Sequence, residues 1–418
     1  MDKAARALIF SAMERFDLIV AGGSLNGASL ALATAGAGLR VAVIDPLDDA
    51  AQTVPGFDGR AYALALASVR LLGAIGIWDA LAAGAEPIRD IRVGDGRAGE
   101  GAGPFVLHFD HREMGEGPMG QMVEDRHLRA ALLAALAAAP GVTRIAARVA
   151  AQRVEPGRVV VTLDDGREIA GLVLAGADGR QSGTAARAGI RRRVSDYRQT
   201  ALVCAIGHEH PHEGCAWQIF LPPGPLAILP LTGNRSSIVW SETRATAAAI
   251  NALPDDAYLA ALRPRFGDFL GEIHIAGARY TYPLNLTVAE RFTAERLALV
   301  GDAARGLHPI AGQGLNAGLR DVAALAEVLV EAMRRGEDPG SAPVLDRYAR
   351  WRRFDSAALA MSTDLFNRVF SSDNPLLRAG RGLGLGLANA VPALRRGLMR
   401  EAAGLTGDLP RLMQGRAL

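Results

Sequence analysis

A glycine-rich turn between two apolar segments constrains the fold of this chain most. Residues 16–45 read FDLIVAGGSLNGASLALATAGAGLRVAVID, which predicts a strand, a turn, a helix and a second strand that ends at Asp45. Such a βαβ unit places the turn at a helix N-terminus, where backbone N–H groups attract phosphate. In a dinucleotide site Gly22 would form the turn, Gly27 would allow close helix packing, and Asp45 would accept hydrogen bonds from ribose. Because Ser24 stands at the second glycine position of this fingerprint, an ordinary tight turn is the alternative for this motif taken alone.

Two later apolar segments also end in glycine and aspartate. LVLAGADG at 172–179 ends at Asp178 and Gly179, and LALVGDAA at 297–304 contains Gly301 and Asp302. Open α/β sheets bind their ligands beyond the carboxyl ends of parallel strands. We therefore expect all three strand ends to lie at one edge of one sheet.

The segment after Asp302 crosses Pro309 and then opens a helix with three glycines, Gly312, Gly314 and Gly318. Free backbone N–H groups at the positive end of a helix suit a group that gains negative charge during its chemistry. A reduced flavin, anionic around its pyrimidine carbonyl, is such a group. The sequence thus predicts a flavin ring beside Gly312, approached by the N–H groups of Gly312, Gln313, Gly314, Leu315 and Asn316, with Pro309 making the crossing rigid.

The middle of the chain has the alternating pattern of strands, as in the hairpin LAILPL-TGNR-SSIVW at 226–240. With 418 residues the chain exceeds one ordinary core, and roughly two to three domains are expected. The predicted fold class is mixed α/β, or α+β: a Rossmann-like FAD-binding domain, an inserted antiparallel β-sheet substrate domain and a helical C-terminal region. Their expected bounds are 16–85, 110–187 and 288–338 for the first, 86–109 and 188–287 for the second, and 339–418 for the third.

Composition narrows the function classes. Lys and Arg total 46 against 44 Asp and Glu, which argues against a nucleic-acid partner. The chain has only two cysteines, Cys204 and Cys215, so we expect a reducing compartment and no disulfide framework. No apolar run reaches the length of a membrane span, and the N-terminal segment lacks a signal-peptide pattern. A cytoplasmic location, peripheral on the inner face of the membrane, is the expectation.

Two further patterns have competing interpretations. His208, His210 and His212 alternate and could face a metal, but the pattern is short and lies beside a turn, so no metal site is predicted. Residues 374–400 carry five arginines and no acid. This basic segment would contact an anionic membrane surface or a biosynthetic complex, or else form a solvated surface helix pair. Its arginines are Arg378, Arg381, Arg395, Arg396 and Arg400.

The three glycine blocks, in this order, resemble those of FAD-dependent aromatic hydroxylases of the para-hydroxybenzoate hydroxylase type. LHPIAGQGLNAGLRDV at 307–322, together with the segments 58–81, 120–136, 224–241 and 398–410, is similar to the ubiquinone-biosynthesis branch of that group. Five positions depart from the pattern: Ser24 replaces glycine, Asp45 replaces glutamate, Asp125 replaces asparagine, Arg305 replaces a frequent histidine, and Ala185 replaces the usual arginine after Ser182. The resemblance implies that FAD contacts Gly22, Gly27, Asp45, Arg60, Gln121, Asp178, Gly179, Gly301, Asp302, Gly312, Gly314 and Asn316, with Pro309 beside the ring.

The resemblance also implies a reaction. An FAD-dependent monooxygenase would hydroxylate the aromatic ring of a polyprenylated phenol in ubiquinone biosynthesis through a flavin hydroperoxide, with O2 and with NAD(P)H as transient reductant. No catalytic acid or base is assigned. The alternatives are an FAD-holding accessory or scaffold subunit of the quinone-biosynthesis complex, a hydroxylase of another aromatic substrate, and a related halogenase or prenyl-lipid reductase.

Overall fold

The computed structural model describes the chain except for residues 1–12, 54–55, 100, 307–312, 354–383 and 385. One sheet, the parallel sheet, has the strand order β18-β19-β11-β1-β2-β8, and neighbouring strands from β19 to β8 run parallel. These strands are nearly continuous apolar runs, as expected for strands covered on both faces. Their bounds are β1 Glu14–Ala21, β2 Val41–Asp45, β8 Val142–Ala146, β11 Glu168–Gly176, β18 Thr293–Ala294 and β19 Leu297–Leu299.

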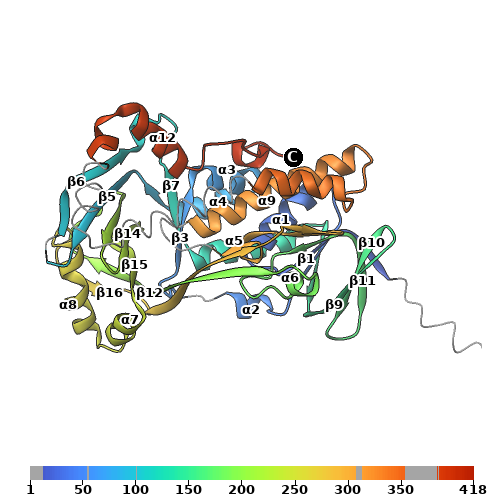
Figure 1. The fold of residues 1–418 in the computed structure, drawn as a ribbon, viewed down its shortest axis with the longest axis horizontal. Helices are drawn as coiled ribbons and strands as arrows, with labels where there is room; N and C mark the ends of the chain where they lie inside the picture. Colours follow the sequence, from blue (N-terminus) through green and yellow to red (C-terminus); the bar gives the residue numbers. More distant parts are fainter. Residues whose placement is uncertain (1–12, 54–55, 100, 307–312, 354–383, 385) are drawn as a thin grey trace, which may run out of the picture.

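Helices cover this sheet. The helix α1 (Leu25–Gly36) contacts both α5 (Asp125–Ala138) and α9 (Gln313–Arg334), and α9 also contacts α3 (Leu66–Ala74), as Figure 1 shows. Their apolar faces join the strands in one core cluster, which contains Leu30, Leu132 and Leu325. On the other side of β11 an antiparallel hairpin adds β9 (Val149–Glu155) and β10 (Arg158–Leu163).

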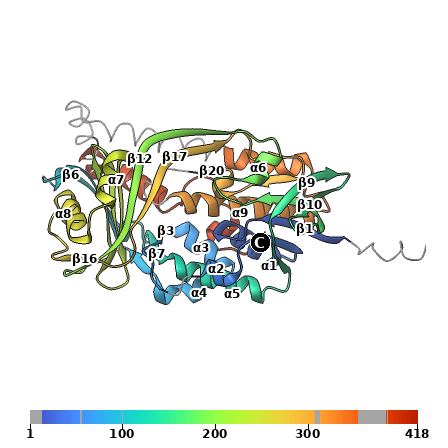
Figure 2. The same cartoon turned by 90° about the horizontal axis from the view of Figure 1, so that it is seen from below.

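The second sheet, the antiparallel sheet, has the order β20-β17-β12-β15-β14-β13-β5-β6, with β16 paired to β12. Figure 2 shows its long strands β12 and β17 running from this sheet toward the parallel one. The helices α7 (Arg244–Asn251) and α8 (Asp255–Phe266) cover one face, where Trp240, Tyr258 and Phe266 form a separate core. The strands are β5 Asp90–Arg97, β6 Gly101–Asp110, β12 Arg192–His208, β13 Cys215–Leu221, β14 Gly224–Leu231, β15 Arg235–Thr243, β16 Ile273–Ile275, β17 Tyr280–Ala289 and β20 Arg305–Gly306.

A small third sheet connects the parallel sheet and the antiparallel sheet. It contains β3 (Ala61–Ala65), β7 (Gly120–Glu124) and β4 (Glu86–Ile88), in the order β3-β7-β4. An apolar cluster that includes Ile88, Met122 and Leu231 packs it against the antiparallel sheet. Short helices complete this region and the turns: α2 Asp49–Gln52, α4 Trp78–Leu81, η1 Ala82–Gly84, η2 His111–Glu113, α6 Gly183–Arg187 and η3 Gly301–Ala303.

The C-terminal part returns to the parallel sheet. Residues 342–353 are helical, and the hydroxyl of Tyr348 donates to the carbonyl of Leu299 at 2.7 Å. After α12 (Pro392–Ala402), the loop before η5 (Arg411–Gln414) is held by Arg320 of α9, which donates to the carbonyls of Gly404 and Thr406. Among the described residues, no single helix combines the length and the apolar composition needed to cross a membrane.

The predicted fold class is confirmed, including the Rossmann-like parallel sheet and the antiparallel sheet. The hairpin LAILPL-TGNR-SSIVW corresponds to β14 and β15. The strand β11 pairs with β10 through its first half and with β19 through its second. The exact domain bounds stay a prediction.

Candidate cofactor site

The ends of β1, β11 and β19 lie side by side at one edge of the parallel sheet. The N–H of Ala177 donates to the carbonyl of Ala21 at 2.8 Å, and the N–H of Val300 donates to Gly176 at 3.0 Å. The turns that follow begin at Gly22, Asp178 and Gly301. Three segments that are far apart in the sequence thus supply one edge, as expected for a ligand site of an open α/β sheet.

The first turn requires glycine at two positions. Gly22 has φ +99°, and a Cβ there would lie 2.5 Å from the carbonyl oxygen of Ala177. A Cβ on Gly27 would lie 1.8 Å from the carbonyl oxygen of Gly22, so α1 could not pack on the turn. Ser24 is the N-cap of α1, but its side chain makes no capping hydrogen bond. The helix therefore keeps N–H groups at its positive end that an anion can bind.

Asp45 closes β2 beside this turn. Its Oδ2 accepts from the N–H of Gly23 at 2.7 Å, and its Oδ1 accepts from Leu47 at 2.9 Å. Asp45 also lines a pocket of about 450 Å³ between β2, β8 and α5, a volume in the range of small-molecule sites. Sequence reasoning missed most of this pocket, because its other residues carry no motif: Val43, Leu47, Asp48, Gln52, Leu136, Arg144, Ile145 and Ala146.

A charged cluster surrounds Asp125 at the start of α5. Arg129 donates from Nε to the carboxylate at 2.8 and 2.9 Å, Tyr62 donates from its hydroxyl at 2.8 Å, and a guanidinium nitrogen of Arg60 lies 3.2 Å away. Arg129 also donates from Nη1 to the Oγ of Ser24 at 3.1 Å. Burial and the neighbouring carboxylate raise the pKa of Tyr62. Burial opposes the charge of Arg60, but Asp58 and Asp125 raise its pKa, so Arg60 stays a cation. Tyr62 and Arg129 lie in the segments 58–81 and 120–136 that carry the family resemblance, but the sequence analysis assigned neither of them to the cofactor.

The aspartates of the other two turns have local partners. Asp178 accepts from the hydroxyl of Ser182 and from the N–H of Thr184 at 2.8 Å, which caps the short helix α6. Asp302 pairs with Arg180 at 3.0 Å near the surface. Gln121 lies in β7, between Leu64 of β3 and Pro87 of β4. The glycine of the second turn, Gly179, has φ +77°.

The start of α9 is described only in part. Pro309 and Gly312, expected beside the flavin ring, lie outside the described residues, as does the side chain of Gln313. A Cβ on Gly314 would meet no atom of the described residues within 4 Å. The side chain of Asn316 holds α9 on the small sheet, since its Oδ1 accepts from Ala65 at 2.9 Å and its Nδ2 donates to Ala63 at 2.8 Å. The expected contacts of Leu315 and Asn316 with the flavin, through their backbone N–H groups, stay a prediction.

Packing within the protein, rather than a ligand, explains the glycine at position 318. A Cβ there would lie 2.6 Å from the side chain of Asn26 in α1, and a Cβ on Gly301 would lie 2.2 Å from the same side chain. Asn26 thus fills the space between α1, α9 and the third turn. Its Oδ1 is buried and accepts no hydrogen bond within the described chain. The hydroxyl groups of a ribityl chain are donors that suit such an acceptor.

The histidine pattern has a structural role. His208 is buried, and its ring nitrogens contact the carbonyl of His210 at 2.8 Å and the hydroxyl of Ser236 at 3.0 Å. His212 contacts the carbonyl of Leu231. In the part of the chain that the structure describes, no group of three or more His, Cys, Asp or Glu side chains could hold a metal.

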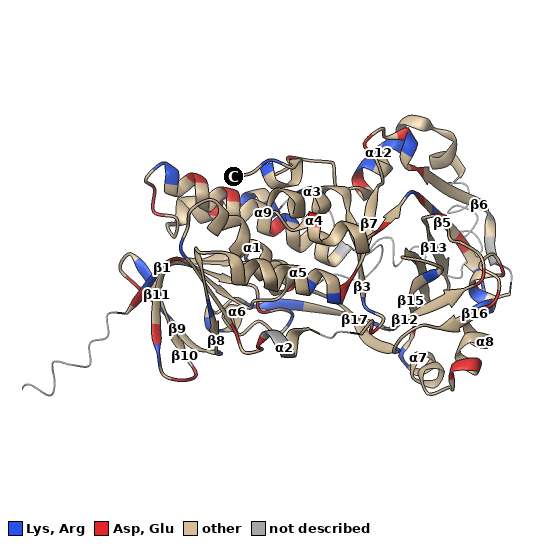
Figure 3. Cartoon of the chain, turned by 180° about the vertical axis from the view of Figure 1, so that it is seen from behind, with Lys and Arg blue, Asp and Glu red and all other residues tan. Residues whose placement is uncertain are grey.

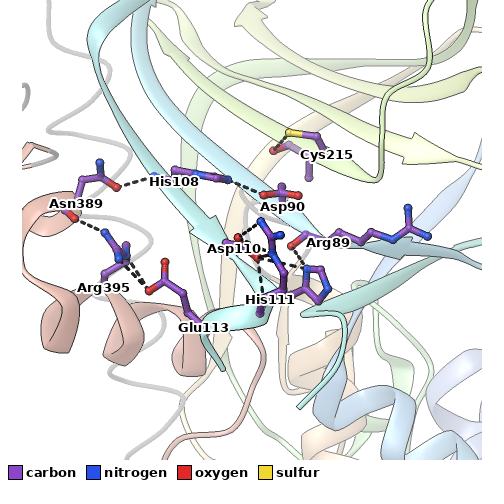
Figure 4. A network of polar contacts seen from close by, with 11 residues as sticks. Arg89, Asp90, His108, Asp110, His111, Glu113, Cys215, Asn389 and Arg395 are labelled. Atoms are coloured by element: carbon purple, nitrogen blue, oxygen red, sulfur yellow. Dashed lines mark hydrogen bonds and ion pairs between the residues drawn. The ribbon is translucent and has the colours of Figure 1, made fainter. Parts of the chain in front are cut away.

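In the structure, acidic side chains from another part of the chain neutralise some of the positive charge of the basic segment. Figure 4 shows Arg395 of α12 directed at Glu113, which lies 2.9 Å away, while Asn389 accepts from the N–H of His108. Arg400 pairs with Glu116 at 3.1 Å, and Figure 3 shows basic and acidic residues next to each other at α12. Arg378 and Arg381 lie outside the described residues. At least two of its five arginines are therefore paired with acids from another part of the chain.

Comparison with known proteins agrees with this geometry. The family model of the FAD binding domain matches residues 15–363. The chain is 46% identical to ubiquinone hydroxylase UbiL of Rhodospirillum rubrum, over 96% of this chain and 92% of the relative. It is 35% identical to 3-demethoxyubiquinol 3-hydroxylase of Escherichia coli, over 93% of this chain and 98% of the relative.

Solved structures share the fold. The p-nitrophenol 4-monooxygenase PnpA of Pseudomonas putida superposes with a TM-score of 0.77 and 19% identity, over 94% of this chain and 99% of that one. The free N–H groups of α1, the carboxylate of Asp45 at the end of β2 and the Asn26 acceptor that lacks a partner within the described chain all fit FAD. The chain belongs to the FAD-binding monooxygenase family that contains the ubiquinone hydroxylases.

Proposed function

We propose that this protein is an FAD-dependent monooxygenase that hydroxylates the aromatic ring of a polyprenylated phenol in ubiquinone biosynthesis, with O2 as co-substrate. The observation that carries the proposal is the 46% identity to a ubiquinone hydroxylase along nearly the full length of both chains. The three converging strand ends support it, because the FAD motifs of the sequence meet at one edge.

FAD, when bound and reduced, supplies the activation of O2 that hydroxylation of a ring requires. The protein's own residues would hold it. The N–H groups at the start of α1 and the turn at Gly22 would bind the diphosphate, and Asp45 would accept from the adenosine ribose. Asp302 and Asn26 would accept from the ribityl hydroxyls. The N–H donors at the start of α9 would favour the negative charge of a reduced flavin.

The antiparallel sheet is proposed to face the substrate. Next to the small sheet it is apolar, since Ala205, Ala216 and Leu231 pack there with Ile88 and Met122. Arg235, a cation on this side, pairs with buried Glu124 at 2.8 Å, and Glu124 also pairs with Arg126 at 2.7 Å. A neutral phenol with a long apolar tail is proposed as the substrate rather than a small benzoate, since each CH₂ that the tail buries would contribute about 0.8 kcal/mol.

The reductant is proposed to be NAD(P)H, which would bind only transiently. This part of the proposal rests on the family resemblance and on the absence of a second dinucleotide fingerprint in the sequence.

The test is a turnover assay on the purified protein. It should show flavin absorbance, consume NAD(P)H and O2 with a prenylated phenol, and yield a product heavier by one oxygen atom in mass spectrometry. Deletion of the gene should lower ubiquinone and accumulate an under-hydroxylated precursor. Bound flavin without a hydroxylated product under any reductant would favour the accessory-subunit alternative, and absence of bound flavin would overturn the proposal.

We also propose that the protein works in the cytoplasm at the surface of the membrane. The two cysteines are thiols in the structure, which suits a reducing compartment. Four apolar side chains are exposed near α12, Leu387 and Val391 before it and Leu394 and Leu398 within it, and Leu387 is 61% exposed. Exposed apolar side chains of this kind suit contact with the acyl chains of an interface more than contact with water.

A further inference from the structure

The N-terminus of α1 has an unusual arrangement at Ser24. A serine in the N-cap position normally accepts from a backbone N–H one turn into the helix. Here Ser24 makes no such bond, and its Oγ accepts from Arg129 instead. The hydroxyl proton of Ser24 remains available to an acceptor, and so do the first N–H groups of the helix.

Arg129 reaches this point from α5, 105 residues along the chain, and its position is fixed from behind. Its Nε contacts both oxygens of Asp125, which is only 2% exposed and is held in turn by Tyr62. The Nη2 of Arg129 has no acceptor within the described chain. Asp125 and Tyr62 therefore orient the guanidinium, Nη1 contacts Ser24, and the remaining N–H donors are available beside the positive end of α1.

A dinucleotide carries its two negative charges at this helix end. Three kinds of hydrogen-bond donor lie at this helix end: the N–H groups of α1, the hydroxyl of Ser24 and the guanidinium of Arg129. The guanidinium carries a full positive charge, and the helix end carries a partial one. An anion is the complement of such a set, and a guanidinium matches phosphate oxygens in geometry as well as charge.

We propose that Arg129 binds the diphosphate of FAD and that Ser24 and Asp125 hold the guanidinium of Arg129 in place. The Ser24–Arg129 pair then makes the phosphate contact that the backbone makes where position 24 is a glycine. This inference rests on the FAD-binding function proposed above and adds a cofactor ligand that the glycine fingerprint does not contain. It also predicts that Ser24→Gly, which restores the glycine of the fingerprint, weakens FAD binding, because the substitution removes the acceptor that positions Arg129.

The experiment measures cofactor affinity on the flavin-free protein. Flavin fluorescence gives the Kd of FAD, and calorimetry gives the Kd of ADP, which carries the diphosphate without the flavin. We expect Arg129→Gln to weaken both ligands by about tenfold to a hundredfold, the effect of one lost charged hydrogen bond. Arg129→Lys should recover part of the loss. Riboflavin, which lacks the diphosphate, should bind the wild type and the glutamine variant equally.

Arg265→Gln is the matched control. Arg265 is 19% exposed and pairs with Glu242, which is 2% exposed, whereas Arg129 is 18% exposed and its partner is 2% exposed. The control lies in α8, on the antiparallel sheet. Both variants should lose thermal stability to a similar degree without cofactor, and only Arg129→Gln should lose FAD and ADP affinity.

A double-mutant cycle tests the role of Ser24. Ser24→Gly should weaken FAD severalfold in the wild-type background and have no effect in the Arg129→Gln background. Equal Kd values for wild type and Arg129→Gln would overturn the inference while leaving the FAD function intact. Failure of the wild type itself to bind FAD would instead overturn the proposed function. An equal loss of riboflavin and FAD affinity would show that Arg129 only supports the fold.

Discussion

Gly27 and Gly314 both belong to glycine-rich segments that the sequence assigns to the cofactor, yet a side chain would meet different surroundings at the two positions. The Cβ of residue 27 would overlap the carbonyl oxygen of Gly22, whereas the Cβ of residue 314 would meet no atom of the described residues within 4 Å. The first glycine is thus required by the protein itself. Among the described residues nothing requires the second, so a bound ligand is the proposed reason for it.

A pair of alanine substitutions separates these two reasons. Gly27→Ala should destabilise the protein by about 3 kcal/mol and prevent FAD binding, because overpacked backbone must move. Gly314→Ala should stabilise the flavin-free protein by about 0.5–1 kcal/mol, since alanine favours a helix, and should weaken FAD binding if the flavin lies against this turn. Urea unfolding and FAD titration measure the two effects. Unchanged FAD affinity in Gly314→Ala would remove Gly314 from the cofactor contacts.

His208 predicts a pH dependence of stability. Burial lowers its pKa, and the nearby His212 and His274 lower it further. The unfolded chain therefore binds a proton that the folded chain does not, and stability rises with pH up to the ordinary histidine pKa of about 6.5. Below that pH, stability should fall by at most about 1.4 kcal/mol per pH unit from this group.

Urea unfolding at pH 7.5 and 5.5 checks this prediction. His208→Gln should lose less stability between the two pH values than the wild type does. His111→Gln, a partly exposed histidine on η2, serves as the control and should follow the wild type. A wild-type pH dependence that His208→Gln leaves unchanged would show that other groups carry it.

The helix α12 and the short helical segment before it, at residues 386–390, combine two kinds of surface. Ala388 and Met399 are buried in a cluster with residues of β6, and Arg395 pairs with Glu113. Leu387, Val391, Leu394 and Leu398 are exposed. The backbone of Val391 is extended (φ −100°, ψ 102°) where α12 begins, so Leu387 lies on a different helical segment from Leu394 and Leu398. The two kinds of surface call for different experiments.

Leu394→Gln together with Leu398→Gln should reduce binding to anionic lipid vesicles by tenfold or more, since each buried leucine contributes about 1.5–3 kcal/mol. Arg395→Gln should affect the stability of α12 more than vesicle binding, because this arginine is engaged with Glu113. Val194→Gln, at a valine that is 65% exposed on β12, is the control. Vesicle sedimentation measures the binding. Equal binding by all variants would leave the solvated surface helix of the sequence analysis.

At the scale of the whole molecule, cofactor binding should stabilise the fold. FAD connects three turns that come from distant parts of the chain, and a ligand at a hundred times its Kd adds about 2.7 kcal/mol to the free energy of unfolding. Thermal unfolding with increasing FAD should therefore show a rising midpoint. A midpoint that stays constant while flavin is bound would mean that the unfolding step observed leaves the FAD site intact.

Features formed by residues close together in the sequence could be predicted from it, whereas contacts between distant segments could not. Gly22, Gly27 and Asp45 lie within one βαβ unit, so spacing alone reveals them. The contact of Arg129 with Ser24 spans 105 residues and that of Arg395 with Glu113 spans 282, and no local pattern indicates either one. Asn316 was assigned to the flavin through its backbone N–H, and no local pattern indicates that its side chain is held by β3, which packing brings to it.

The edge that receives the cofactor has a consequence for biosynthesis. Its three strand ends are separated by more than a hundred residues each, and the last, at Leu299, becomes available only when most of the chain has been made. A nascent chain that has produced Gly22 and Asp178 still lacks the strand that completes the edge and the helix α9 that covers it. Long-range contacts of this kind form late in folding. The flavin is therefore loaded by a nearly finished polypeptide, and a ribosome stalled before residue 297 would carry a chain that cannot retain it.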